Sequence, residues 1–215
     1  MVSTGEADGL IPTIAFLTRM EQPIGWAVGN WLEVHEGIQL ASAPTPRSQP
    51  IPALKKAYTQ LQSGGAHVKW VEMVQAQGGD VQAALDNCAT FMTTRATNTT
   101  TYQLKARNAG FVTDINVMTI GLVGVDLGAR RQRAGTSIDP WAGMSFAVKV
   151  GDHVEEGNIL VTVFHDKNLA GALECDERIY LAFELSSKAA AEQLPITTHM
   201  VTTDGFREME MVPYC

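Results

Sequence analysis

The chain has 215 residues, of which 45% are hydrophobic and 18% are charged, with a formal net charge of −7 at pH 7. A chain of this length and balance is expected to fold as one large or two small globular domains rather than to stay disordered. The net acidity argues against a nucleic-acid binder, because such proteins carry a clustered basic surface. The densest basic stretch holds only Arg130, Arg131 and Arg133, which is typical of a solvated loop.

Cysteine usage and hydropathy indicate where the chain works. The three cysteines, Cys88, Cys175 and Cys215, are odd in number and irregular in spacing. This pattern argues against a disulfide framework and favours a reducing intracellular compartment, either the cytoplasm or an organelle matrix. No apolar run approaches the roughly 20 residues that a membrane-spanning helix needs. The N-terminus has no signal-peptide pattern, so we expect no membrane span and no secretion.

The first half of the chain predicts one strand and several helices. Residues 12–20 form a β-branched and aromatic run that predicts a short buried strand. Pro23 and Gly25 then predict a turn, because proline fixes φ and glycine relaxes it. Apolar residues at helical spacing predict helices over residues 27–40, 53–62 and 66–77. The proline-rich stretch 42–52 predicts an extended linker, and the polar stretch 93–101 predicts an exposed loop.

The second half changes to short elements between glycines. The patterns predict strands over residues 110–115, 146–150, 159–164 and 179–185, and helices over 117–127 and 168–175. Mixed short strands and helices favour an α+β fold over a regular βαβ series. The change of composition near residue 105 predicts a boundary between a part over 1–104 and a part over 105–215.

A search for chemistry-bearing motifs is mostly negative. The sequence shows no P-loop, no dinucleotide fingerprint, no zinc-site spacing and no nucleophile elbow. Its histidines are scattered and are expected to be surface or structural residues. Residues 148–160 place two β segments around a turn with glycine at both ends, a shape that resembles the hairpins of biotinyl and lipoyl carrier domains. The carrier lysine motif is missing, so a structural hairpin is favoured over a carrier.

Four segments in chain order carry a more specific pattern. The longest, residues 18–36, has the sequence T-R-M-E-Q-P-I-G-W-A-V-G-N-W-L-E-V-H-E. The others are L-Q-S-G-G-A at 61–66 with Q-G-G-D at 77–80, G-F-V-T-D-I at 110–115 with L-G-A-R at 127–130, and K-V-G-D-H-V-E-E-G at 149–157. This ordered set resembles the C-terminal half of the pyrimidine nucleoside phosphorylase (thymidine phosphorylase) family.

The resemblance implies a pentosyltransferase reaction of pyrimidine metabolism. Phosphate, the co-substrate, cleaves thymidine or uridine to free base and a pentose 1-phosphate. The resemblance also implies a partial mixed-sheet α/β phosphorylase core over residues 1–104, followed by a C-terminal α/β hammerhead (barrel-sandwich-like) domain over 105–215. In the family, the phosphate loop and the base-binding Arg/Ser/Lys set precede the T-x-M-x-Q-P segment. We therefore expect no catalytic and no cofactor-binding residue in this chain, and no turnover by the chain alone.

The resemblance implies one site within the chain. Some family members bind a potassium-like cation (K⁺) through two backbone carbonyls and a glutamate, and the matching positions are Ile24, Ala27 and Glu36. Hard oxygen ligands suit such a cation. These residues are the predicted metal ligands, and the phosphate loop would supply the rest of the shell. The alternative is that Glu36 is an ordinary surface residue of a helix.

The chain also departs from the family pattern. Arg19 stands where the family usually has Asp, and Trp26 and Trp31 replace residues that are often Arg and Ala. The linker 42–52 replaces a longer, helical connection. Adding the volume of a tryptophan to a filled core typically costs about 1–3 kcal/mol or more. The changes cluster where the remainder of the enzyme would pack.

Three interpretations stay open. In the first, the chain is one piece of a phosphorylase whose N-terminal half is a separate polypeptide or was cut away. In the second, it is a degenerate homologue (a pseudoenzyme) that serves as a structural or interaction subunit of a larger assembly. The third interpretation is an autonomous carrier-like domain. The first two imply a protein partner, which is the N-terminal half, a second copy in a homodimer, or an unrelated complex.

Overall fold

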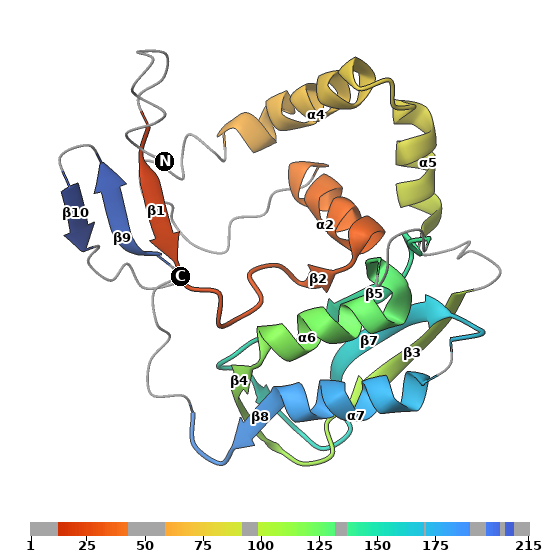
Figure 1. Cartoon of the computed structure of the whole chain (residues 1–215), viewed down its shortest axis with the longest axis vertical. Coiled ribbons are helices and arrows are strands. Elements are labelled where there is room, and N and C mark those ends of the chain that lie inside the picture. Colours follow the sequence, from red (N-terminus) through yellow and green to blue (C-terminus); the bar gives the residue numbers. More distant parts are fainter. Residues whose placement is uncertain are drawn as a thin grey trace.

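The structure, a computed structural model, describes residues 13–42, 59–91, 99–131, 137–169, 171–189, 197–202 and 205–208. Helices and short strands alternate along these ranges, which confirms the α+β class (Figure 1). Every strand pair within them is antiparallel. The parallel pairing expected of a mixed sheet is therefore not found in the described part of the chain, and the hammerhead assignment stays a prediction.

The strands are β1 (Ala15–Thr18), β2 (Ala27–Val28), β3 (Thr99–Lys105), β4 (Gly110–Ile115), β5 (Gly143–Phe146), β6 (His153–Val154), β7 (Ile159–Asp166), β8 (Phe183–Ser186), β9 (Thr197–Thr202) and β10 (Gly205–Glu208). The helices are α2 (Asn30–Ser42), α4 (Gly65–Ala76), α5 (Val81–Phe91), α6 (Val117–Gly124), the π-helical turn η1 (Val125–Ala129) and α7 (Ala172–Ala182). The described strands form three sheets with the orders β1-β9-β10, β2-β5-β7-β3 and β6-β4-β8.

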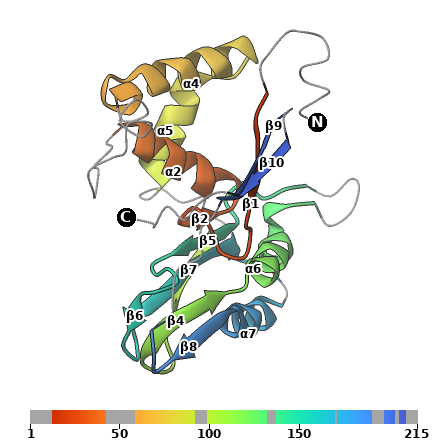
Figure 2. The ribbon, with the colours of Figure 1, turned by 90° about the vertical axis from the view of Figure 1, so that its left-hand side faces the viewer.

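Strand β7 lies between β5 and β3 and is buried along most of its length. Val161 and Val163 belong to the main apolar core, whereas Phe164 packs with Leu32 of α2 in a second cluster. Successive side chains of a strand point to opposite faces, so β7 serves both clusters. Helices α6 and α7 lie side by side over the first face and α2 lies against the other (Figures 1 and 2).

The main core consists of side chains from α6, η1, α7 and the strands around them. Its largest fully buried members are Ile115, Ile120, Leu127, Met144, Ile179, Val112, Val123, Val154, Val161 and Val163. Helix α6 begins where the Asn116 side chain accepts a hydrogen bond from the Thr119 amide at 2.9 Å, a normal N-cap. The chain leaves the helical conformation at Gly128, with φ at 106°, which confirms the predicted stop.

The start of α2 lies against β5 with backbone in contact with backbone. A Cβ atom on Gly29 would lie 2.4 Å from the carbonyl oxygen of Ala142, and one on Gly143 would lie 2.1 Å from that of Val28. Only glycine fits at both positions. Ala27 and Val28 pair with β5, so the helix predicted from residue 27 begins at Asn30 instead.

The predicted buried strand at residues 12–20 is wrong in its burial. Strand β1 occupies part of this range, but Phe16 is 53% exposed and Leu17 46% exposed. Among the described strands it pairs with β9 alone and lies at the edge of its sheet. The apolar pattern of residues 12–20 is typical of a strand that is covered on both faces. The part of the chain that the structure describes covers little of either face of β1.

Two predicted elements of the second half are shifted. The strand predicted over 179–185 begins only at Phe183, because residues up to Ala182 belong to α7. The buried residues of α7 include Cys175, Ile179 and Ala182, which recur at helical spacing. This period of about 3.6 residues favours a helix and outweighs the β-branched composition that favours a strand. The strand predicted over 146–150 is β5, which ends at Phe146.

Other predictions have mixed outcomes. The helix over 66–77 is confirmed as α4 and ends before Gly78, whose φ is 75°. Helix α5 was missed, although Asp80 caps it by accepting from the Ala83 amide at 2.9 Å. The loop predicted over 93–101 is wrong for Thr99–Thr101, which open β3.

Most of the predicted linker lies outside the described residues. The same holds for residues 1–12, 43–58 and 92–98, and for Arg133 and Cys215.

The sheet β2-β5-β7-β3 takes strands from both sides of residue 105. The division into 1–104 and 105–215 stays a prediction. Among the described helices, none is both long enough and apolar enough to cross a membrane.

The buried face of α7 allows a direct test of the core. Ile179 is 1% exposed, whereas Leu181 of the same helix is 82% exposed. We expect Ile179→Ala to lower the free energy of unfolding by about 2–5 kcal/mol, because it leaves a cavity. The matched control Leu181→Ala should change it by less than about 0.5 kcal/mol. Urea unfolding followed by circular dichroism measures both, and equal losses would contradict this packing.

Candidate functional site

The three residues predicted to bind a metal lie around the turn between β1 and α2. Glu36 reaches back from α2 and accepts hydrogen bonds from the amides of Trp26 at 2.8 Å and Ala27 at 3.1 Å. A Cβ atom at Gly25 would lie 2.9 Å from a Glu36 carboxylate oxygen, so glycine permits this approach. The structure thus brings Ile24, Ala27 and Glu36 together, with Glu36 holding the amide groups of the turn.

The carbonyl groups of the same turn meet a lysine from the second half of the chain. The Lys149 ammonium donates to the carbonyl of Pro23 at 2.9 Å and to that of Gly25, and lies 3.4 Å from the carbonyl of Ile24. It also lies 4.8 Å from the centre of the Trp26 ring, within cation–π range. Burial lowers the pKa of Lys149, and the nearby carboxylates of Glu36 and Asp152 oppose that shift.

Lys149 opens the family-like segment 149–157, but nothing in the sequence gives it a role. No spacing rule connects residue 149 with residue 24, so only the folded chain reveals the contact. The Ile24 carbonyl and the Glu36 carboxylate both have protein donors. A metal ion at Ile24, Ala27 and Glu36 stays a prediction. Elsewhere in the described ranges, no three His, Cys, Asp or Glu side chains gather to hold a metal ion.

A pocket of about 330 Å³ opens beside this turn, between α2 and the sheet β2-β5-β7-β3. Its floor is one register row that crosses all four strands: Ala27, Ser145, Thr162 and Gln103. The row presents neutral polar groups, and Glu36 at the rim is hydrogen-bonded to backbone amides. The pocket floor therefore offers neutral hydrogen-bonding groups.

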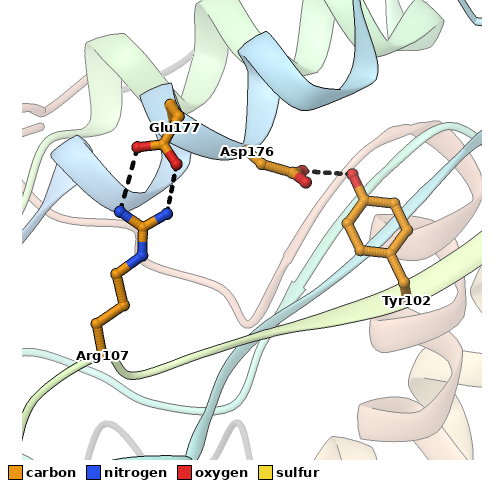
Figure 3. Close-up of polar contacts among 4 residues, drawn as sticks. All are labelled: Tyr102, Arg107, Asp176 and Glu177. Carbon is orange, nitrogen blue, oxygen red and sulfur yellow. Dashed lines mark hydrogen bonds and ion pairs between the residues drawn. The ribbon is translucent and has the colours of Figure 1, made fainter.

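A second polar cluster joins β3 and the residues after it to α7 (Figure 3). The Tyr102 hydroxyl donates to the Asp176 carboxylate at 2.5 Å, and the Arg107 guanidinium binds Glu177 through both of its terminal nitrogens. Burial, reinforced by Asp176, raises the pKa of Tyr102, while the hydrogen bonds from Arg107 lower the pKa of Glu177. These groups satisfy one another, so the cluster fastens α7 rather than performing chemistry.

Cys175 is also unsuited to chemistry. Its thiol is free and buried in the core, and burial raises its pKa. A reactive cysteine needs access and a lowered pKa, so Cys175 acts as an apolar core residue. The predicted absence of catalytic residues from this chain stays a prediction.

Comparison with known proteins connects this fold to a family. Residues 111–174 match the pyrimidine nucleoside phosphorylase C-terminal domain. The chain is 29% identical over 214 residues to the pyrimidine-nucleoside phosphorylase of Bacillus subtilis, covering 89% of this chain and 47% of that protein. The chain is related to the pyrimidine nucleoside phosphorylases, through their C-terminal part. The resemblance found in the sequence is thereby confirmed.

Two staphylococcal relatives give the same result. The Staphylococcus haemolyticus protein is 29% identical over 226 residues, covering 95% of this chain and 49% of that protein. The Staphylococcus aureus protein is 30% identical over 177 residues, covering 72% of this chain and 39% of that protein. Both are pyrimidine-nucleoside phosphorylases. The chain spans about half the length of the curated relatives it matches, or less.

The raised pKa of Tyr102 predicts a specific alkaline behaviour. An unperturbed tyrosine has a pKa of about 10. The contribution of Tyr102 to stability is therefore fully present below about pH 10, and is lost as the pH rises toward the higher pKa of the folded state. We expect tyrosinate absorbance to show a late phase in the wild-type chain that Tyr102→Phe lacks. Asp176→Asn should move this phase to lower pH. A late phase that persists in Tyr102→Phe would contradict the assignment.

Proposed function

We propose that this chain provides the C-terminal part of a pyrimidine nucleoside phosphorylase, and that phosphorolysis requires a polypeptide carrying the N-terminal part. The relatives named for this activity align with the chain over just under half of their length. In the proposed reaction, phosphate oxygen bonds to C1′ of a pyrimidine nucleoside as the C1′–N bond breaks. The base leaves with the electron pair and takes up a proton.

The observation that supports this proposal is the exposed state of β1. Phe16 and Leu17 are neighbours on the strand, so their side chains point to opposite faces, and both are about half exposed. Ile14 and Met20 extend the apolar surface at 56% and 76% exposure. Strands that are apolar on both faces are typical of sheets covered on both sides. The β1 surface, defined by these four residues, is therefore the proposed docking site for the N-terminal part.

The chemistry of phosphorolysis also supports a separate N-terminal part that carries the groups that bind phosphate and base. A phosphorylase must hold a phosphate dianion with backbone and cationic donors and must stabilise a positively charged ribose in the transition state. Two arginines at α7 are occupied: Arg107 binds Glu177, and Arg178 binds Asp126. We propose that the phosphate-binding and base-binding groups come from the N-terminal part.

The alternative is a non-catalytic homologue that serves as a structural or interaction subunit. One observation favours it. Trp31, which departs from the family pattern, stacks on Trp141 with ring centres 5.9 Å apart. The substitution is thus built into a packed cluster with Leu32 and Phe164. A chain that keeps its own stable packing at this place suits a role as a scaffold.

An activity assay with a complementing half separates the two. We expect the 215-residue chain to release no uracil or thymine from uridine or thymidine in the presence of phosphate, as measured by chromatography. Coexpression with the part of the Bacillus subtilis relative that this chain does not match should give phosphate-dependent base release, and that part alone should give none. Release by the chain alone would contradict the proposal. A stable complex without turnover would favour the scaffold.

The β1 surface can be tested without activity. Phe16→Asp should leave the free energy of unfolding within about 0.5 kcal/mol, because the side chain is half exposed. It should nevertheless weaken copurification with the complementing half at least tenfold, because a charge would be buried in the interface. The control Leu181→Asp, on the 82% exposed position of α7, should copurify normally. Equal behaviour of the two variants would rule out β1 as the docking site.

A further inference from the structure

The turn over residues 23–25 directs three successive main-chain carbonyls toward one ammonium group. The Lys149 Nζ atom lies 2.9 Å from the Pro23 oxygen and 3.4 Å from the Ile24 oxygen, and it donates to the Gly25 oxygen. A lysine ammonium has three N–H donors and no acceptor. The number of donors thus equals the number of carbonyls that surround it.

The amides that directly follow this turn meet an anion. Glu36 accepts from the amides of Trp26 and Ala27, each with a different carboxylate oxygen. The turn is therefore held by a cation at its carbonyls and by a carboxylate at its amides. Charge-assisted hydrogen bonds of this kind are about twice as strong as neutral ones.

The fold fixes Lys149 in place. Its own amide donates to the Asp152 carboxylate at 2.8 Å, and the amide of Gly151 donates to the carbonyl of Val112 in β4 at 2.8 Å. The ammonium also lies near two aromatic rings, with their centres 4.8 Å away for Trp26 and 5.8 Å away for Phe146. The loop between β5 and β6 is thus a rigid platform that brings the ammonium to the turn.

We propose that Lys149 is the built-in cation of this carbonyl turn, and that its ammonium takes the place of a bound monovalent cation. The sequence resemblance assigned the Ile24 carbonyl to a cation site, and the structure brings a charge from the chain itself to that oxygen and to the neighbouring carbonyls of Pro23 and Gly25. The contact also latches the segment before α2 to the second half of the chain. This inference rests on the geometry of the turn and is independent of the proposed function.

Removal of the Lys149 side chain leaves carbonyl oxygens that have lost their donor. Buried or half-buried carbonyls without a donor destabilise a fold. A free cation of suitable size and charge, such as K⁺ or NH₄⁺, would then bind the space that the ammonium occupied. A lysine that is replaced by methionine would leave no such space, because the thioether chain fills most of it.

Thermal unfolding of the full chain in different salts tests the proposal. Wild type, Lys149→Ala and Lys149→Met are compared in choline chloride, KCl and NH₄Cl at equal ionic strength. We expect the same Tm for wild type in all three salts. Lys149→Ala should lose about 4–8 °C in choline chloride and recover at least half of the loss in KCl or NH₄Cl. Lys149→Met should lose a similar amount in every salt. The exposed Lys105→Ala is the control and should match wild type.

Three results would overturn the proposal. The first is a Lys149→Ala variant as stable as wild type in choline chloride, because the carbonyls would then need no cation. The second is a loss of the same size in every salt. The third is a wild-type Tm that rises in KCl relative to choline chloride, because the intact turn would then bind a metal ion in addition to Lys149. If Lys149→Ala does not fold in choline chloride, recovery of helical circular dichroism in KCl or NH₄Cl replaces Tm as the measure.

Discussion

The double-sided burial of β7 is the constraint on which the rest of the fold depends. Val161 and Val163 anchor the core beneath α6 and α7, whereas Thr162 and Phe164 face α2. A strand of this kind must be covered twice, because each uncovered face would leave large apolar side chains in water. The second cover comes from the N-terminal segment. Its attachment to β7 and β5 therefore determines where the candidate site forms.

The N-terminal segment attaches through close packing and electrostatics together. Gly29 and Gly143 let the backbones of the α2 start and β5 touch. Trp31 fills the space above them by stacking on Trp141. By volume alone Trp31 would overfill a packed core, but in the structure it stacks on a partner of equal size. The hydrogen bonds of Lys149 and Glu36 to the turn add directional polar contacts to this apolar packing.

Sequence patterns predicted elements wherever one local signal dominated. The 110–115 and 159–164 strands and the α4 helix carried such signals and are confirmed. The end of α7 was missed because Ile179 and Phe183 favour a strand by composition, although the helical spacing of the buried residues decides. Strand β9 was missed because one of its two partner strands, β1, lies far away in the chain.

The candidate site likewise combines residues that lie close together in the sequence with a contact between residues far apart in it. The sequence motif names Ile24, Ala27 and Glu36, and near neighbours such as Ile24 and Ala27 share a turn, whereas Glu36 reaches back to that turn from α2. The motif cannot show which donor the carbonyls face, since Lys149 reaches them from the β5–β6 loop. Main-chain carbonyls accept positive charge either from a bound ion or from a tethered ammonium, and of the predicted ligand oxygens the Ile24 carbonyl is the one that lies near Lys149. Residues 23–36 thus give the carbonyls and the carboxylate of this turn, whereas a residue more than a hundred positions away supplies the ammonium that its carbonyls meet.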